Sequence, residues 1–159
     1  MHADVVIRPA LYEDLFAIVT LINDGGPDGK PRENLPSNLP DCYRESFTRI
    51  LQDENTFLMV AELHGRVVGT FQLNYLICLA GKGQEDAQLE GVHVQSQSRG
   101  QGMGMQMIAW VIKHAKTRNC RRIQLTTDKK RKRAHQFYER LGFVASHEGM
   151  KLLLDICQN

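Results

Sequence analysis

The stretch that decides the fold of this sequence reads Arg99-Gly100-Gln101-Gly102-Met103-Gly104. It lies between a run that predicts a strand, Leu89–Val94, and one that predicts a helix, Gln101–Thr117. Glycines let the backbone approach a ligand closely, and the amides at a helix start attract anions. Taken alone, the stretch is equally consistent with a tight turn and with a phosphate site.

The spacing of the glycines narrows the ligand. A dinucleotide fingerprint, Gly-x-Gly-x-x-Gly, would need a third glycine where Met105 stands, and a P-loop would need Gly-Lys-Ser/Thr. The pattern that remains is Arg/Gln-x-x-Gly-x-Gly/Ala, which Arg99, Gly102 and Gly104 fill. This pattern resembles the pyrophosphate loop of the GCN5-related N-acetyltransferase (GNAT) family.

A second block makes the resemblance specific. Ala134–Phe143 reads Ala-His-Gln-Phe-Tyr-Glu-Arg-Leu-Gly-Phe, which is similar to the C-terminal signature of that family, Ala-x-x-Phe-Tyr-x-x-x-Gly-Phe. The opening Ile7–Ala10 and the run Glu62–Gly69 are also typical of it. The similarity to the family spans residues 5 to about 155. A weaker, local similarity, from Leu125 to Glu148, relates the chain to the aminoalkylphosphonate N-acetyltransferases.

The apolar patterns along the chain predict strands and helices in the order β-α-α-β-β-β-α-β-α-β. Gly25–Pro40 predicts an irregular loop, and Phe143–Val144 and Met150–Ile156 predict closing strands. We therefore expect a single α/β (α+β) domain over residues 5–155. The resemblance implies a mixed, mostly antiparallel sheet of six to seven strands, flanked by about four helices.

Composition bounds the class of protein. The 159 residues are 42% hydrophobic and 24% charged, with a net charge of +2, and no apolar run is long enough to cross a membrane. This predicts no membrane partner and argues against a general attraction to nucleic acid. The start lacks the pattern of a secretory signal, which favours the cytoplasm. The cysteines are scattered, and no set of ligands predicts a metal site.

The resemblance implies that the cosubstrate is acetyl-CoA. In the family, the strand before the glycine loop splays from its neighbour, and its backbone pairs with the pantetheine arm. That role falls to Val92, His93 and Val94, with an amide near Val92 polarising the thioester carbonyl. The cofactor-binding residues implied further are Arg99, Gly100, Gln101, Gly102, Met103, Gly104, Arg131, Ala134 and Phe137.

Two side chains are candidates for catalysis. Tyr138 matches the position of the acid that protonates the thiolate of coenzyme A, and a phenol suits this role; alternatively, its ring only packs at a helix end. With period-two alternation, Glu90 shares a face with Val92 and Val94, and His93 faces the other side. Glu90 is interpreted as the general base for the amine, or alternatively as a residue that orients it.

One position departs from the family pattern. Arg131 stands where many relatives carry an asparagine that binds the pantetheine arm. It belongs to the basic run Lys129–Arg133, which could be a solvated helix face, could attract the phosphates of the coenzyme, or could contact RNA.

The acceptor is expected to be a small-molecule amine, recognised by Gly25–Pro40, the second helix and the loop Ala80–Asp86. The alternatives are a protein or peptide acetyltransferase, and a non-catalytic module that binds coenzyme A or RNA. The apolar run Met150–Leu154 could contribute to a homodimer or be buried within the monomer.

Overall fold

The computed structural model describes residues 5–26 and 30–154. The chain forms two compact units, residues 1–125 and 126–159, and each is described by itself. The first unit contains a five-stranded sheet in the order β1-β2-β3-β4-β5. Its strands are β1 (Val6–Pro9), β2 (Thr56–Leu63), β3 (Arg66–Leu76), β4 (Asp86–Val94) and β5 (Arg122–Leu125).

The sheet is antiparallel from β1 to β4, and only β5 runs parallel to its neighbour β4. His64 and Gly65 turn β2 into β3, both with positive φ (50° and 74°), which matches the right-handed twist of a two-residue hairpin. The return from β4 to β5 goes through a helix, as a parallel pair requires.

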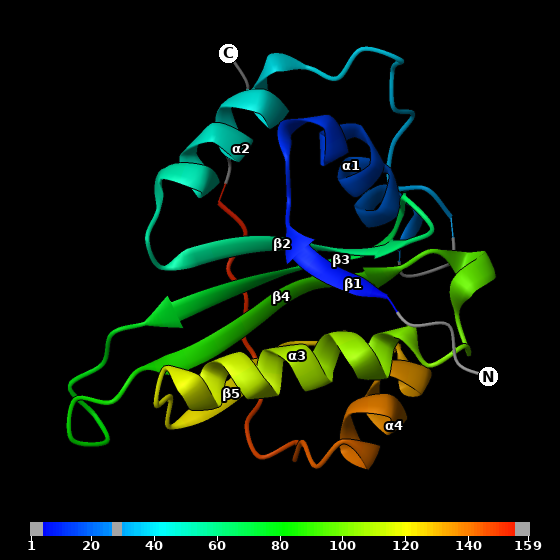
Figure 1. Cartoon of the computed structure of the whole chain (residues 1–159). Helices are drawn as coiled ribbons and strands as arrows, with labels where there is room; N and C mark the ends of the chain where they lie inside the picture. Colours follow the sequence, from blue (N-terminus) through cyan, green and yellow to red (C-terminus); the bar gives the residue numbers. More distant parts are fainter. Residues whose placement is uncertain (1–4, 27–29, 155–159) are drawn as a thin grey trace. The chain divides into compact units, whose positions relative to one another are not determined.

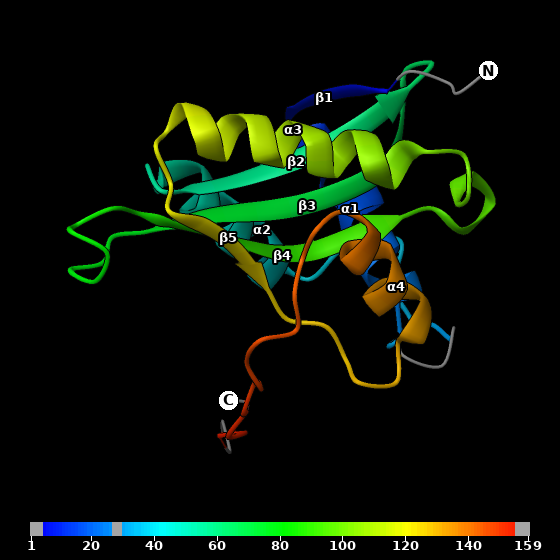
Figure 2. The same ribbon diagram turned by 90° about the horizontal axis from the view of Figure 1, so that it is seen from below.

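Three helices cover the two faces of this sheet (Figure 1). Helices α1 (Leu15–Asp24) and α2 (Asp41–Gln52) lie over one face, where Ile18, Phe47 and Val60 are among the buried core residues. Helix α3 (Met103–Thr117) runs along the other face (Figure 2), and its Trp110 packs against Phe71 of β3 with ring centroids 5.6 Å apart. Two short 3₁₀ helices, η1 (Tyr12–Asp14) and η2 (Ser96–Ser98), complete this unit.

An ion-pair network joins Arg8 of β1 to Asp14 of η1 and Glu62 of β2. The guanidinium of Arg8 binds both carboxylate oxygens of Asp14, at 2.6 and 3.0 Å, and Oε2 of Glu62 at 2.7 Å. Asp14 is only 5% exposed and also accepts the amide of Leu11. These contacts hold the pKa of Asp14 below its usual range, mainly through the hydrogen bond from Arg8. The motif thus fixes β1, η1 and β2 to one another.

Strand β4 contains a bulge at its centre. Thr70 pairs with His93 and Gln72 pairs with Glu90, so that two residues of β4 lie opposite one residue of β3. Gly91 supplies the positive φ of 58° that this irregularity uses. The bulge changes which side chains of β4 share a face.

The second unit contains one helix, α4 (Lys132–Arg140). It ends in a Schellman motif: the amide of Gly142 donates to Glu139 and that of Phe143 donates to Tyr138, with Gly142 at φ 90°. The Tyr138 and Phe143 rings make the accompanying hydrophobic contact, with centroids 5.5 Å apart. The Phe-Tyr-x-x-x-Gly-Phe spacing therefore encodes a helix stop.

The expected four helices are confirmed, but the expected six to seven strands are wrong for the described residues, which form five. Neither Phe143–Val144 nor 150–154 is a strand; residues 155 and 156 of the predicted closing strand lie outside the described part. A strand requires a hydrogen-bonded neighbour, and β propensity alone does not supply one. The side chains of Met150, Leu152, Leu153 and Leu154 are 73–95% exposed.

Candidate active site

The second half of β4 extends beyond the strand that pairs with its outer edge. Strand β5 pairs with β4 from Asp86 to Leu89 and ends there, whereas β4 continues to Val94. No strand in the described part of the chain pairs with this edge of β4 from Glu90 onward. An unpaired edge offers amide and carbonyl groups to an extended ligand. Val92, His93 and Val94, which the resemblance implies for the pantetheine arm, belong to this second half of β4.

The glycine loop follows directly and leads into α3. Gly100 and Gly102 have positive φ values of 77° and 83°, and Gly102 is the N-cap of α3. As glycine, it offers no capping side chain, so amides of the first turn remain available to an anion. Met103 is 1% exposed and anchors the loop, whereas the side chain of Arg99 is exposed and donates from Nε to the carbonyl of Val94 at 3.0 Å. The loop thus has the backbone geometry of an anion site.

Glu90 belongs to a patch of polar side chains on the face of the sheet that carries α1 and α2. Cross-strand partners share a face, which places Gln72 beside Glu90 and Asn74 beside Gln88. Nε2 of Gln88 donates to Oε1 of Glu90 at 2.7 Å, which fixes one carboxylate oxygen. This arrangement leaves the carboxylate half-buried and oriented, as a base or an amine-binding group requires.

The bulge corrects the predicted orientation of the β4 side chains. Because Thr70 and Gln72 are two residues apart on β3, their partners His93 and Glu90 lie on one face. The prediction that His93 faces away from Glu90 is therefore wrong, and so is the prediction that Val94 shares the face of Glu90. His93 is 8% exposed and packs against Gly25 at the end of α1, where a Cβ would lie 2.1 Å from its Nδ1.

A cavity of about 240 Å³ lies between α1 and α2, above β2 and β3. Its lining is mostly apolar, and Gln72, the cross-strand neighbour of Glu90, is one of its polar lining residues. A second hollow of about 290 Å³ shares Ser46, Ile50 and Gln72 with it and adds Arg49 and Asp53. Glu90 itself lines neither hollow, but its cross-strand neighbour Gln72 lines both.

Part of the Gly25–Pro40 loop closes this cavity. The side chain of Asn23 makes two hydrogen bonds to the backbone of Glu33. It accepts one from the amide of Glu33 at 2.9 Å and donates one to the carbonyl of Glu33 at 2.8 Å. The hydroxyl of Tyr43 on α2 donates to the Glu33 carboxylate, which raises the pKa of Tyr43 to about 12. Arg32 and Glu33 line the cavity.

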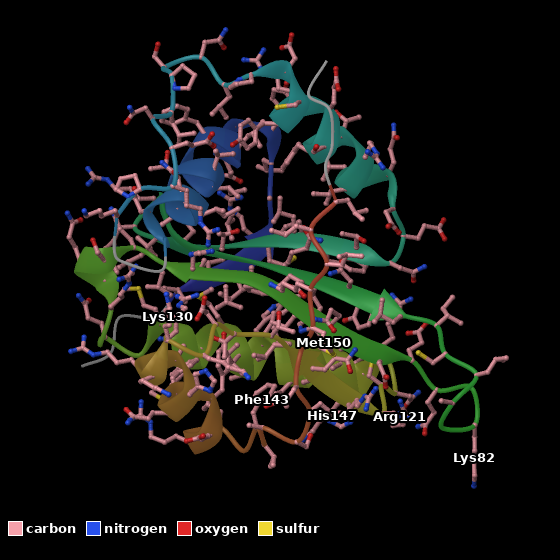
Figure 3. The ribbon with its side chains drawn as sticks, turned by 180° about the vertical axis from the view of Figure 1, so that it is seen from behind. Lys82, Arg121, Lys130, Phe143, His147 and Met150 are labelled. Atoms are coloured by element: carbon pink, nitrogen blue, oxygen red, sulfur yellow. The ribbon has the colours of Figure 1, made fainter. Side chains whose placement is uncertain are left out.

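The loop Ala80–Asp86 does not fulfil the expectation that it faces the acceptor. It connects β3 to β4 at the end of the sheet away from the glycine loop, and Lys82 at its tip points away from the strands (Figure 3). Asp86 is 1% exposed and paired with Arg121 and Arg122, an arrangement that fixes the start of β5. None of the described residues 80–86 lines either hollow.

In the second unit, the phenol of Tyr138 lies between the rings of Phe137 and Phe143. Burial raises its pKa, and Arg131 partly opposes that shift. Its hydroxyl has no hydrogen bond to a described residue, so it remains available as a donor. Both readings of Tyr138 are compatible, since the ring packs in the helix stop and the hydroxyl is not used there.

Arg131 is the N-cap residue of α4, and Ala134 lies in its first turn, donating its amide to the Arg131 carbonyl at 2.9 Å. The side chains of Lys129 to Arg133 are all exposed, and of these Lys129 pairs with Glu148 at 3.4 Å. The basic run is therefore a solvated surface in the described structure, which leaves its charges free to meet an anionic ligand.

Some residues of the site were not predicted. Gln72, Gln88 and Asn74 carry polar side chains at alternate positions of apolar strands, which is a period-two signal that the sequence does contain. Asn23 and Tyr43 gave no such signal, because their role depends on how the loop folds over α1 and α2.

Comparisons with known proteins identify the family of this chain. The model of the acetyltransferase (GNAT) family matches residues 19–143, and the chain therefore belongs to this family. A relative from Salmonella typhimurium, named aminoalkylphosphonate N-acetyltransferase, is 31% identical over 142 residues, covering 89% of this chain and 86% of the relative.

Solved structures share the fold. One from Bacillus halodurans, described as a transcriptional regulator, is 42% identical with a TM-score of 0.89, covering 95% of this chain and all of that one. Another from Clostridium acetobutylicum, described as a predicted acetyltransferase with acetyl-CoA, is 19% identical with a TM-score of 0.71, covering 94% and 96%. In the described residues no helix is long and apolar enough to span a membrane, and no cluster of side chains could hold a metal ion.

Proposed function

We propose that this protein uses acetyl-CoA to acetylate the primary amine of a small molecule by direct transfer. The observation that carries this proposal is the structure of β4. One strand presents an oriented carboxylate, Glu90, near a cavity and then a backbone edge that no described strand covers, which leads into the glycine loop. A thioester arm and an amine can therefore meet along a single strand.

Each part of the donor has a proposed partner. The backbone of Val92, His93 and Val94 would pair with the pantetheine arm, and the amides of Gly100–Gly104 would hold the pyrophosphate. Arg99, Gln101 and Met103 shape that loop. The resemblance alone implies that Arg131, Ala134 and Phe137 also bind the coenzyme. The similarity to a structure described with acetyl-CoA is consistent with this assignment.

The proposed reaction requires three proton transfers. The amine must be neutral to attack, so Glu90 accepts a proton from the ammonium, directly or through water. The nitrogen lone pair then forms the C–N bond at the thioester carbonyl carbon while an amide near Val92 stabilises the developing oxyanion. As the C–S bond breaks, the nitrogen loses its extra proton to water, and Tyr138 gives its proton to the leaving thiolate. The products are an amide and coenzyme A, with no net oxidation.

A thiol-release assay over a panel of amines tests the proposal. Simple alkylamines, aminoalkylphosphonates, aminosugars and lysine-containing peptides would be offered with acetyl-CoA, and calorimetry would measure the binding of coenzyme A alone. We expect micromolar coenzyme binding and thiol release that depends on the amine, with an equal yield of acetylamide. Coenzyme binding without release for any amine would exclude the enzyme and leave a binding module.

A protein or peptide substrate is the alternative within the same chemistry. It would need an open groove, whereas Asn23, Glu33 and Tyr43 bond the loop across the helices and close the cavity. A regulatory, nucleic-acid-binding role is suggested only by the description of the Bacillus halodurans relative and by the exposed basic run. Release with peptides only, or retention on nucleic acid at 150 mM salt without turnover, would favour these alternatives.

We also propose that the protein forms a homodimer through residues 150–154. Their apolar side chains are 73–95% exposed at Met150, Leu152, Leu153 and Leu154, which is costly for a monomer in water. Strand β5 has a neighbour on one side only in the described sheet, so its outer edge can accept a further strand. A second copy supplies such a strand with matching apolar character.

A further inference from the structure

The chemical character of the cavity beside Glu90 limits the classes of amine that it can accept. Its walls are mainly hydrocarbon. The apolar side chains come from three of the elements around it: Leu15, Ile18 and Ile22 from α1, Phe47 and Ile50 from α2, and Leu58 from β2. Such a lining favours a hydrocarbon group over a sugar ring or a phosphonate, because it offers such polar atoms few hydrogen bonds.

The polar groups of the cavity lie at two places. Gln72 projects from the sheet beside Glu90, whereas Asn23, Arg32, Glu33 and Tyr43 belong to the loop and the helix ends over the cavity; Ser46 adds one hydroxyl from within α2. Asn23 and Tyr43 are engaged in holding Glu33. A ligand that extends from Glu90 into the cavity therefore places its amine at the sheet and its other end against the apolar side chains of α1 and α2.

The volume sets the size of this group. Liquid water takes about 30 Å³ per molecule, so a cavity of about 240 Å³ holds about eight non-hydrogen atoms. This matches a chain of six to eight carbons or a phenylethyl group, and it is too small for an aminoglycoside.

We propose that the acceptor is a primary alkylamine or arylalkylamine whose hydrocarbon part fills the cavity between α1 and α2. The inference rests on the proposed acetyltransferase function, and it selects the substrate class for the same site. Glu90 receives the ammonium end, and the hydrocarbon end displaces water from the apolar walls. Binding strength should then grow with the apolar area that the amine buries.

Ser46 allows the cavity to be filled without changing the core. It is exposed on α2 and lines both hollows, so the Ser46→Phe substitution adds a ring to the space that the amine would occupy. Thr48 is exposed on the same helix and lines neither hollow, and Thr48→Phe is therefore the matched control.

The experiment measures kcat/KM for n-alkylamines from ethylamine to octylamine, for phenylethylamine and for 2-aminoethylphosphonate, in the intact chain and in both variants. We expect kcat/KM to rise about fourfold per methylene up to six to eight carbons. In Ser46→Phe the value for octylamine should fall at least tenfold while that for ethylamine changes less than twofold. Thr48→Phe should keep the original profile.

The outcomes separate the inference from the function on which it rests. Turnover that is flat with chain length, or fastest with 2-aminoethylphosphonate, would overturn the inference and leave the acetyltransferase in place. No thiol release with any amine would overturn both. Calorimetric binding of octylamine provides a second readout, since saturable binding should be lost in Ser46→Phe and kept in Thr48→Phe; equal binding in both variants would also count against the cavity.

Discussion

Glu90 and His93 lie on the same face of β4, although they are three residues apart, because the strand bulges between them. A regular strand would turn these two side chains to opposite faces. The bulge therefore brings a carboxylate and a buried imidazole to the face that carries α1 and the cavity. Strand irregularities of this kind often re-aim side chains next to active sites.

The Gly91→Ala substitution tests the bulge. Gly91 has φ 58°, which an L side chain adopts at a cost of about 1–2 kcal/mol, although no neighbouring atom would clash with a Cβ. If the strand relieves this strain by straightening, Glu90 and His93 separate, and kcat should fall at least tenfold. Gly65→Ala is the control, since it carries a similar φ of 74° in the β2–β3 turn and has open space. Equal activity in the two variants would contradict a role for the bulge.

The Glu90→Gln substitution tests the proposed base. The amide keeps the hydrogen bonding with Gln88 but cannot take a proton, so we expect kcat to fall by about 100-fold or more. The acidic limb of the pH–rate profile should disappear as well. A rise in KM with an unchanged pH profile would show that Glu90 orients the amine instead. Gln88→Leu is a useful companion, since it removes the orienting bond and leaves the base.

The Tyr138→Phe substitution separates the two roles of this residue. The ring contact with Phe143 that accompanies the helix stop is retained, so thermal stability should change by less than about 0.5 kcal/mol. Loss of the proton donor should lower kcat by about 10- to 100-fold. In the native enzyme the basic limb of the pH–rate profile should lie above the ordinary range of a tyrosine, because burial raises the pKa of Tyr138. This limb should be absent in the variant. Unchanged turnover would assign Tyr138 to packing alone.

The Arg8–Asp14 pair should make stability depend on pH. Arg8 holds the pKa of the buried Asp14 carboxyl below its unfolded value of about 3.9, so the pair stabilises the fold above that pH. Its contribution is lost as the pH falls through the lower, folded pKa. Arg8→Met leaves Asp14 buried without its cation and should cost about 3 kcal/mol at pH 7. Urea unfolding between pH 7 and pH 3 measures both effects, with exposed Arg66→Met as the control.

The Leu153→Glu substitution tests the proposed dimer. Leu153 is 89% exposed, so the change costs little within one chain but places a charge in an apolar interface. We expect the native chain to sediment as a dimer and the variant to sediment as a monomer with nearly the same melting temperature. Lys151→Glu is the control, since it introduces the same negative side chain at an exposed neighbouring position. A monomeric native chain at 50 μM would contradict the proposal.

The sequence alone determined the family, the position of the glycine loop before a helix and the order of most elements. These features are local: glycine spacing sets where positive φ is available, and apolar periodicity marks helices and strands. The Phe137–Phe143 signature was equally readable, because a Schellman stop is formed by residues that are close in sequence.

Only the tertiary structure decided the face of His93, the place of Gln72 beside Glu90, and the closure of the cavity by Glu33. Each depends on a partner that is distant in the sequence. The face of His93 depends on the bulge, where β4 has one residue more than β3, and the place of Gln72 depends on the register of these two strands. The position of Glu33 depends on hydrogen bonds from Asn23 of α1 and Tyr43 of α2. The prediction of the closing strands was wrong for the same reason. The apolar residues 150–154 have β propensity, but no strand of the described structure pairs with them. Pairing is a property of two segments, and one segment's sequence does not contain it.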